Sequence, residues 1–436
     1  MRYRSIFLLL ALLLLLSGCQ MLTVEQMYAP PERSEDFSSL QAAINSAMVN
    51  MEYCAPISGE NQQIVQSADL NGDAVEEYLL FAKGTTEAPL HVMIFSQEDG
   101  ICVHKETISL VGSAFDRVEY AQIDGVAGLE LVIGTQVSEQ VSRSLSVFQF
   151  SEGEAQQLLT ADYMNFLTVN LDRNTRSELF VIRSGPKEND RGVVELFAVE
   201  GGVMQRSVEV SMSETADKLK RILVGQLYDG EPAVYIASAV DEDTLITDVY
   251  ALVGGTFTNV SLSNESGTSI KTMRNYFVYA DDIDTDGIME LPSLVPTRSI
   301  DTAWNRSGQN LIRWYSMRAD GSEVDKLYTY HNFLGGWYIR IDSTLAPNVS
   351  VVDLGNVCDF YVWNGNDAMK IMTIYALTGQ SREEQSVAEG RFVLHKSDTV
   401  IYSASLDYNA LSYEITQETV MRSFHLIHEH WKTGET

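Results

Sequence analysis

Two loops of this chain carry oxygen-bearing side chains at a spacing that suits a hard cation. The first loop places Asp69, Asn71, Asp73 and Glu77 at positions 1, 3, 5 and 9. A later loop has an acid at all four of these positions, in Asp282, Asp284, Asp286 and Glu290. Position 7, which is Val75 or Ile288, would add a backbone carbonyl. Carboxylate, amide and carbonyl oxygens are the ligands of calcium in proteins, so calcium is the ion that we expect.

Three further copies lie between these two loops and have lost part of the ligand set. They span residues 122–130, 170–178 and 226–234. Val126 replaces a ligand in one copy, and Arg173 and Arg176 bring positive charge to another. We therefore expect metal at the first loop (69–77) and the fifth loop (282–290), and little or none between. The competing interpretation is that Asp, Asn and Gly simply form turns.

The loops belong to a longer repeat that recurs roughly every fifty residues. An apolar strand follows each loop, at 78–81, 129–133, 179–182, 233–236 and 291–295. Two later strands in each unit flank a turn glycine, which is Gly100, Gly153, Gly202, Gly255 or Gly321. An aromatic residue, expected to pack between units, precedes each glycine by five or six positions: Phe95, Phe148, Phe197, Tyr250 and Tyr315. Four strands per unit at this period predict a β-propeller, because radial repetition hides the sheet edges.

With these loops and strands, the segment from about 60 to 335 resembles the FG-GAP or VCBS-type repeats of integrin-like β-propellers. The resemblance implies one blade per unit and calcium held by the ligands of the first and fifth loops. This chain departs from the pattern in having Glu at position 9 and in having three central loops that lack part of the ligand set. The whole chain is also similar to propeller lipoproteins of Clostridia-type bacteria.

The N-terminus has the features of a secretory signal. Arg2 and Arg4 precede an apolar run from Phe7 to Leu16, and Leu16-Ser17-Gly18-Cys19 follows. This segment resembles a bacterial lipoprotein signal. The resemblance implies a signal peptide over 1–18, a lipid on Cys19, a tether over 19–35, and a body held outside the cytoplasm on a membrane. An uncleaved anchor is the alternative.

Composition disfavours one class of partner and leaves two interpretations of the cysteines. Thirty Lys and Arg residues against 60 Asp and Glu give a formal charge of −30. Nucleic acids are bound through neutralisation of phosphates by Lys and Arg, so they are unexpected partners. An extracytoplasmic setting permits a Cys54–Cys102 disulfide, but buried thiols are an equal interpretation.

The regions around the repeats have their own patterns. Apolar residues spaced by three and four predict a helix within 36–54 that caps the first repeat. The propeller is expected over 55–334. Strands and a closing helix at 416–431 predict a small α+β domain over 335–436, with two more divergent blades, seven in all, as the alternative.

Other residues that could do chemistry have simpler interpretations. His425, His428 and His430 are not spaced as a zinc-protease motif, and a solvated helix end explains them. Trp304, Trp314, Trp337 and Trp363 could stack on sugars, but their strand positions favour core packing. The sequence contains no nucleophile elbow, phosphate-binding loop, dinucleotide fingerprint or paired Cys-x-x-Cys motif.

The sequence therefore favours a surface-anchored, non-catalytic binding or assembly protein with an unknown protein or glycan ligand. An extracellular hydrolase acting on glycans or peptides is the alternative, with a site assembled from several blades. A structural envelope lipoprotein without any ligand is the third interpretation.

Overall fold

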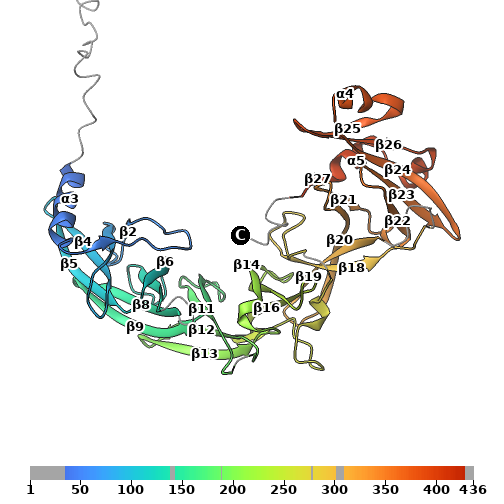
Figure 1. Cartoon of the computed structure of the whole chain (residues 1–436). Coiled ribbons are helices and arrows are strands. Elements are labelled where there is room, and N and C mark those ends of the chain that lie inside the picture. Colours follow the sequence, from blue (N-terminus) through green and yellow to red (C-terminus); the bar gives the residue numbers. More distant parts are fainter. Residues whose placement is uncertain (1–34, 138–142, 188, 276–277, 301–308, 428–436) are drawn as a thin grey trace, which may run out of the picture.

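The chain is mainly β, and its sheets follow one another in an open arc (Figure 1). The computed structural model describes residues 35–137, 143–187, 189–275, 278–300 and 309–427. Within these residues there are six sheets, and all of their strand pairs are antiparallel. The predicted signal, the tether and Cys19 lie outside the described residues.

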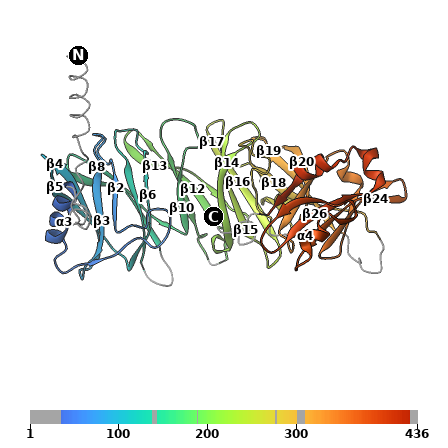
Figure 2. The ribbon, with the colours of Figure 1, turned by 90° about the horizontal axis from the view of Figure 1, so that it is seen from above.

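Helix α3 and the first sheet form one end of the arc (Figures 1 and 2). The helix spans Glu35–Ala47, which confirms the predicted N-terminal helix. The sheet consists of β1 (Glu52–Tyr53), β2 (Val65–Ala68), β3 (Glu77–Lys83), β4 (Leu90–Glu98) and β5 (Ile101–Leu110).

Three four-stranded sheets come next, each built from consecutive strands. The second contains β6 (Ala114–Ala121), β7 (Glu130–Gln136), β8 (Arg143–Ser151) and β9 (Glu154–Tyr163). The third contains β10 (Asn165–Val169), β11 (Glu178–Arg183), β12 (Val193–Glu200) and β13 (Val203–Ser211). The fourth contains β14 (Leu219–Gln226), β15 (Pro232–Ala239), β16 (Leu245–Val253) and β17 (Thr256–Asn259).

Two five-stranded sheets complete the arc. The fifth has the order β18 (Glu290–Pro296), β19 (Asn310–Met317), β20 (Glu323–Asn332), β21 (Trp337–Ile341) and β27 (Phe424–Leu426). The sixth has the order β22 (Val349–Asp353), β23 (Val357–Asn364), β24 (Asp367–Leu377), β26 (Ile401–Leu406) and β25 (Phe392–Lys396). The short helices are α4 (Arg382–Gln385) and α5 (Gln417–Ser423), with 3-10 turns at η1 (Ala216–Lys218), η2 (Ile270–Thr272), η3 (Ala346–Asn348), η4 (Ala388–Gly390) and η5 (Tyr408–Tyr413).

The strand that was predicted after each loop is present in all five units, but the fifth unit has only an isolated bridge, Asp281 with Glu290, in place of the strand expected before its loop. The five apolar strands of the sequence analysis coincide with β3, β7, β11, β15 and β18. All five turn glycines have positive φ, where a side chain is disfavoured. The strand pairing also shifts by one residue beside the aromatic in the first, second, third and fifth sheets, which marks a recurrent β-bulge.

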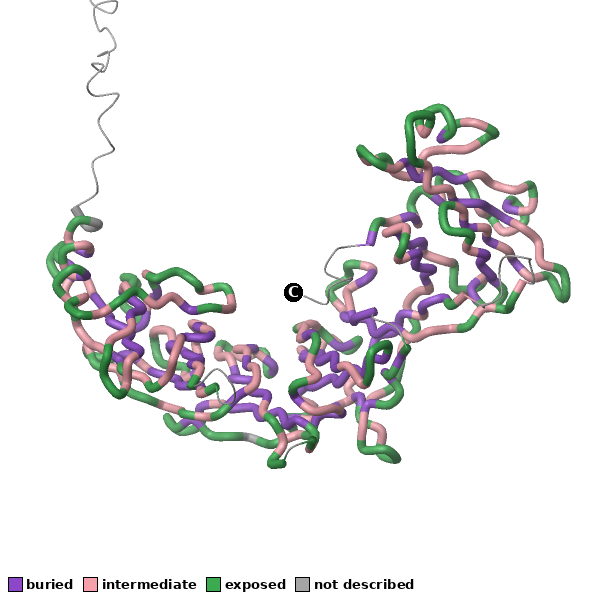
Figure 3. The backbone as a smooth tube through the Cα atoms, viewed as in Figure 1, coloured by how far each residue is buried: buried purple, intermediate pink, exposed green. Residues whose placement is uncertain are grey.

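The first five sheets are apolar on both faces, so consecutive sheets share buried seams, and Figure 3 shows buried segments in every sheet along the arc. The sixth sheet buries the face of Phe360 toward the fifth sheet and leaves the opposite face, with Asp359, partly exposed. In β11, Leu179 and Val181 face the second sheet, whereas Phe180 and Ile182 face the fourth. The repeat aromatics lie in these seams as predicted, at most 7% exposed. Phe95 differs from the other four in what it contacts. It packs on Leu40 and Ile44 of α3 and not on a neighbouring sheet.

Helix α3 therefore stands where a preceding sheet would pack. Closure into a ring would bring the sixth sheet against this face, but α3 covers the face and the sixth sheet lies at the far end of the arc (Figure 1). The described part of the chain thus has the strand repeat of a propeller without its closure.

The C-terminal region differs from the prediction in two details. The expected boundary at 334/335 lies inside the fifth sheet, because β21 pairs with β20. The predicted helix over 416–431 ends at Ser423, because the next residues form β27 and pair with β21. One further sheet, the sixth, follows the five recognised units, and it repeats their aromatic-to-glycine spacing in Phe360 and Gly365.

Candidate functional site

The glutamate at position 9 closes four of the five loops by a bond to the loop backbone. In each loop one carboxylate oxygen accepts the N–H of the residue at position 2. The pairs are Leu70 with Glu77 (3.0 Å), Ile123 with Glu130 (2.6 Å), Leu171 with Glu178 (2.8 Å) and Ile283 with Glu290 (3.2 Å). All four glutamates are at most 4% exposed. Position 9 is therefore a structural acceptor in these loops, whatever else it binds.

Burial makes these carboxyl groups unusually weak acids. Removal from water raises the pKa of Glu130 and of Glu290 to about 7, and it also raises the pKa of Glu77 and Glu178. The backbone hydrogen bonds oppose this shift without cancelling it in Glu130.

The first loop is organised around the Asp69 carboxylate. Its two oxygens accept the N–H groups of Gly72 (2.7 Å) and Ala74 (3.0 Å). Asn71 Nδ2 donates to Asp73 Oδ2 (3.2 Å) and to Glu77 Oε1 (2.8 Å). Val75 at position 7 donates its N–H to Asp73. The side chain between the carboxylates is thus a neutral amide, which can present its oxygen to a cation by rotating.

The fifth loop brings its acids closer together. Carboxylate oxygens of Asp282, Asp284 and Glu290 lie within 4.8 Å of one another, the one such group among the described residues. Asp282 accepts the N–H groups of Asp286 and Gly287, both at 2.9 Å. Ile288, at position 7, donates its N–H to Asp286. These bonds leave an oxygen of Asp284 buried with no hydrogen-bond partner.

Lys326 of β20 projects its ammonium into this group of acids. Its Nζ donates to Asp286 and lies 3.6 Å from Asp284 and 3.9 Å from Glu290. Burial lowers the pKa of Lys326, but the bond to Asp286 and the nearby carboxylates outweigh burial and raise the pKa overall. The donor set of the first loop fits calcium, whereas the fifth loop would bind it only after Lys326 moves away.

Several polar groups of the central loops are paired within the chain, although Asn170 Oδ1 of the third loop is buried without a hydrogen-bond partner. Gln149 donates to Asp124 at 2.6 Å in the second loop, and Asn174 donates to Asp172 at 2.6 Å in the third. In the fourth unit the Tyr235 hydroxyl donates to the Gln226 carbonyl. The expectation of little or no metal between the first and fifth loops stays a prediction.

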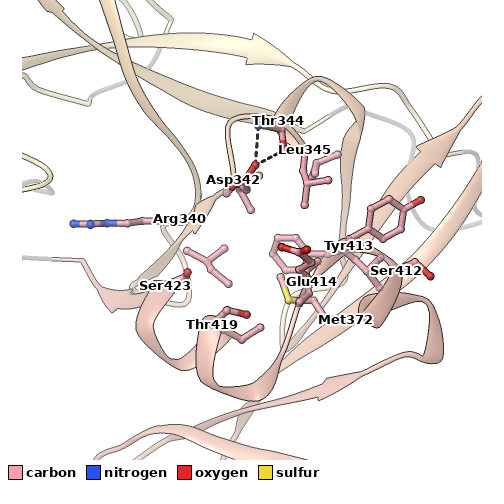
Figure 4. Close-up of a pocket in the computed structure, with 17 residues that line it drawn as sticks. Arg340, Asp342, Thr344, Leu345, Met372, Ser412, Tyr413, Glu414, Thr419 and Ser423 are labelled. Atoms are coloured by element: carbon pink, nitrogen blue, oxygen red, sulfur yellow. Dashed lines mark hydrogen bonds between the residues drawn. The ribbon is translucent and has the colours of Figure 1, made fainter.

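A pocket of about 630 Å³ lies between the fifth and sixth sheets, beside α5 (Figure 4). Its apolar lining includes Val349, Phe360, Ile371, Met372 and Val420, which belong to the seam between these sheets. The recurrent aromatic of the sixth sheet is therefore part of the pocket wall. The sequence analysis did not find this pocket, because its lining comes from four separate segments of the chain.

Polar groups surround this apolar lining. Asp342 and Glu414 supply carboxylates, and Thr419 and Ser423 supply hydroxyls from α5 (Figure 4). Hydrogen bonds from the hydroxyl and the backbone N–H of Thr344 lower the pKa of Asp342. Arg340 points away from the other labelled side chains in Figure 4, and its guanidinium donates to the Ile283 carbonyl of the fifth loop at 2.6 Å.

The remaining sequence candidates have structural roles where they are described. Trp314 and Trp337 are buried, and Trp363 packs beneath the Arg298 guanidinium at 3.8 Å. The ring of His425 stacks on Tyr338. Trp304, His428 and His430 lie outside the described residues. Cys54 and Cys102 are not joined by a disulfide, and Cys358 is buried.

The sequence analysis did not identify Lys326 as a site residue, although the sequence contains a signal for it. A lysine stands five residues after the turn glycine in both the first and the fifth unit, at Lys105 and Lys326. These are the two units with complete loops, so the coincidence could have drawn attention to the position.

Comparisons with known proteins identify no family. No family model and no curated protein matches the chain. Among solved structures, the exotype rhamnogalacturonan lyase YesX is similar over 66% of this chain and 63% of its own, with 13% identity and a TM-score of 0.29. The rhamnogalacturonan lyase YesW covers 73% and 76%, with 10% identity and a TM-score of 0.30. Chaetomium thermophilum Sqt1, bound to the N-terminus of ribosomal protein L10, covers 78% and 94%, with 8% identity and a TM-score of 0.31. At these scores the likenesses carry no argument about activity.

The raised pKa of Glu130 predicts a pH dependence of stability. A folded-state pKa above the unfolded value stabilises the fold fully at low pH, and this stability is lost as pH rises through about 7. Between about pH 5.5 and pH 8, wild type should lose about 2 kcal/mol relative to Glu130→Gln. Urea unfolding at both pH values measures the difference.

The exposed Glu154 of β9 provides the control for this experiment. Glu154→Gln should keep the wild-type pH dependence. Equal pH dependence of wild type and Glu130→Gln would contradict a raised pKa at Glu130.

Proposed function

We propose that this chain is a non-catalytic binding protein of the cell surface, built on an open array of β-propeller-type units. The pocket between the fifth and sixth sheets is the observation that carries the proposal. Concave sites with an apolar lining and a few polar groups are the usual form of small-molecule sites, and the pocket has this form.

The pocket lining selects the chemistry of the ligand. Its lining is largely aliphatic and aromatic, and its carboxylates are those of Asp342 and Glu414. The one arginine of the lining directs its guanidinium to the fifth loop instead. A compact organic ligand with an apolar body and a cationic group therefore suits the pocket better than an anionic one.

The same lining supports binding over hydrolysis. The described lining residues include no histidine or cysteine, so they offer no nucleophile paired with an imidazole base. A general acid for glycoside cleavage needs a raised pKa, whereas the pKa of Asp342 is lowered. The carboxyl groups with raised pKa values close the loops and are not part of the pocket lining.

Filling the pocket tests this proposal. Ser423→Trp places a bulky ring at the pocket wall and should abolish binding of benzyltrimethylammonium, which we expect wild type to bind. Glu414→Gln should weaken the binding by roughly twofold to fivefold, because it removes one of two carboxylates and Glu414 is exposed. Ligand-observed NMR measures both effects, with benzenesulfonate as the matched anion.

Met421→Trp is the control, because Met421 lies on the same helix, is 46% exposed and does not line the pocket. This variant should bind like wild type. Equal binding of the cation and the anion, or full binding by Ser423→Trp, would contradict the proposed site.

We further propose that the protein is held on the membrane by a lipid on Cys19, as the N-terminal resemblance implies. Among the described helices, none is long and apolar enough to cross a membrane. Cys19→Ala should move the protein from the membrane fraction to the soluble fraction after cell fractionation, while Cys54→Ala should leave it in the membrane fraction. Retention of the Cys19→Ala variant on the membrane would exclude the lipid anchor.

The first loop is the proposed calcium site, and its role is to stiffen the first unit. Asp69, Asn71, Asp73 and Glu77 would hold the ion together with the Val75 carbonyl. The ion would neutralise carboxylates that are close together in an acidic protein.

Calcium should therefore bind wild type and raise its melting temperature, and Asp73→Ala should remove both effects. Calorimetric titration with parallel thermal melts measures them. The matched control is Asp172→Ala in the third loop, which should leave the titration unchanged. A wild type without any binding heat or shift in melting temperature would exclude this calcium site.

A further inference from the structure

The β-bulge of the fifth sheet explains why the Lys326 ammonium reaches the fifth loop. In the pairing of β19 with β20, Trp314 lies opposite Leu327 and Tyr315 lies opposite Asp325. Lys326 is therefore the extra residue of the bulge, and it has no partner across the ladder. A bulge changes the direction of a side chain relative to a regular strand. Here the side chain is 15% exposed and extends to Asp284, Asp286 and Glu290.

The first unit has the same bulge with the same residue type. In the pairing of β4 with β5, Lys105 is the extra residue beside Phe95. Its ammonium bonds Glu98 at the end of β4 and makes no described contact with the first loop. The equivalent of Glu98 in the fifth unit is Arg318, which pairs with Asp229 at 2.9 Å. Lys326 thus lacks the partner that holds Lys105 away from its loop.

We infer that Lys326 is a tethered cation that takes the place of calcium in the fifth loop. The ammonium lies against two of the three acids that could share a metal ion, Asp284 and Glu290. A divalent ion in the same space would be repelled by this charge, and the lysine cannot turn an oxygen toward it. The Lys326 ammonium therefore offsets part of the negative charge of the fifth loop without metal, and calcium does not enter the loop while Lys326 stays.

The inference goes beyond the proposed function and does not depend on it. It predicts that removing the ammonium converts the fifth loop into a divalent-cation site. Lys326→Met keeps the length of the apolar stem and leaves the four acids of the loop without the lysine ammonium. This variant should melt at a lower temperature than wild type in EDTA, and millimolar calcium should restore the melting temperature.

The experiment is calorimetric titration of calcium into the mature chain, with melts in EDTA and in calcium. Lys326→Met should bind one calcium ion more than wild type. Lys105→Met is the matched control, since it removes the same residue type from the same bulge position, and it should bind as many ions as wild type. A Lys326→Met variant with the wild-type number of sites and no response to calcium would overturn the inference.

A second variant tests the inference without altering the lysine. Asp284→Asn in the wild-type background should leave the number of bound calcium ions unchanged, because the fifth loop takes up none. A lower number in this variant would overturn the inference, since calcium would then share the loop with Lys326. Absence of calcium from the first loop would change the wild-type count but not the gain of one site in Lys326→Met, so the two proposals fail separately.

Discussion

The two apolar faces of the first five sheets are the constraint on which the rest of this structure depends. A strand such as β11 sends Leu179 toward one neighbouring sheet and Phe180 toward the other, so no sheet of the array could be stable alone. Burying one such side chain contributes about 1.5 to 3 kcal/mol, and every seam contains many of them. Stacking therefore continues along the chain until a helix covers the outer face, as α3 does at the first sheet, or until that face is polar, as in the sixth sheet.

Near both ends of the array, helices and turns pack against the repeated sheets. At the first end, α3 offers Leu40 and Ile44 to Phe95, in the place of the aromatic seam that joins all later sheets. At the other end, α5 and the turn η5 lie beside the seam of the fifth and sixth sheets and leave a pocket there. The candidate ligand site is thus a consequence of imperfect packing at the point where regular stacking ends.

Each loop holds several carboxylates close together in an acidic chain, so the carboxylates need hydrogen-bond donors or cations beside them. Buried glutamates such as Glu130 accept backbone N–H groups, and the remaining oxygens need further donors. In the first loop the Asn71 amide donates to Glu77. In the fifth loop the Ser316 hydroxyl donates to Glu290, and the Lys326 ammonium donates to Asp286. One loop pattern therefore has different counter-groups, and in our proposal the counter-group decides whether a metal ion can enter.

The sequence by itself determined the repeat: its strands, its turn glycines and the buried aromatics. These features depend on local spacing, and local spacing reflects which side of a strand is apolar and where the chain must turn. Phe360 and Gly365 show the same spacing in the sixth sheet, but no acidic loop precedes that unit, so the loop-based search did not reach it.

Only the tertiary structure decided that α3 covers the first sheet, that the segment after Ser423 leaves the helix to pair with β21, and that Lys326 meets the fifth loop. Each of these outcomes depends on which surface meets which across long separations in the chain, and hydrophobic periodicity records that a face is buried without recording what buries it.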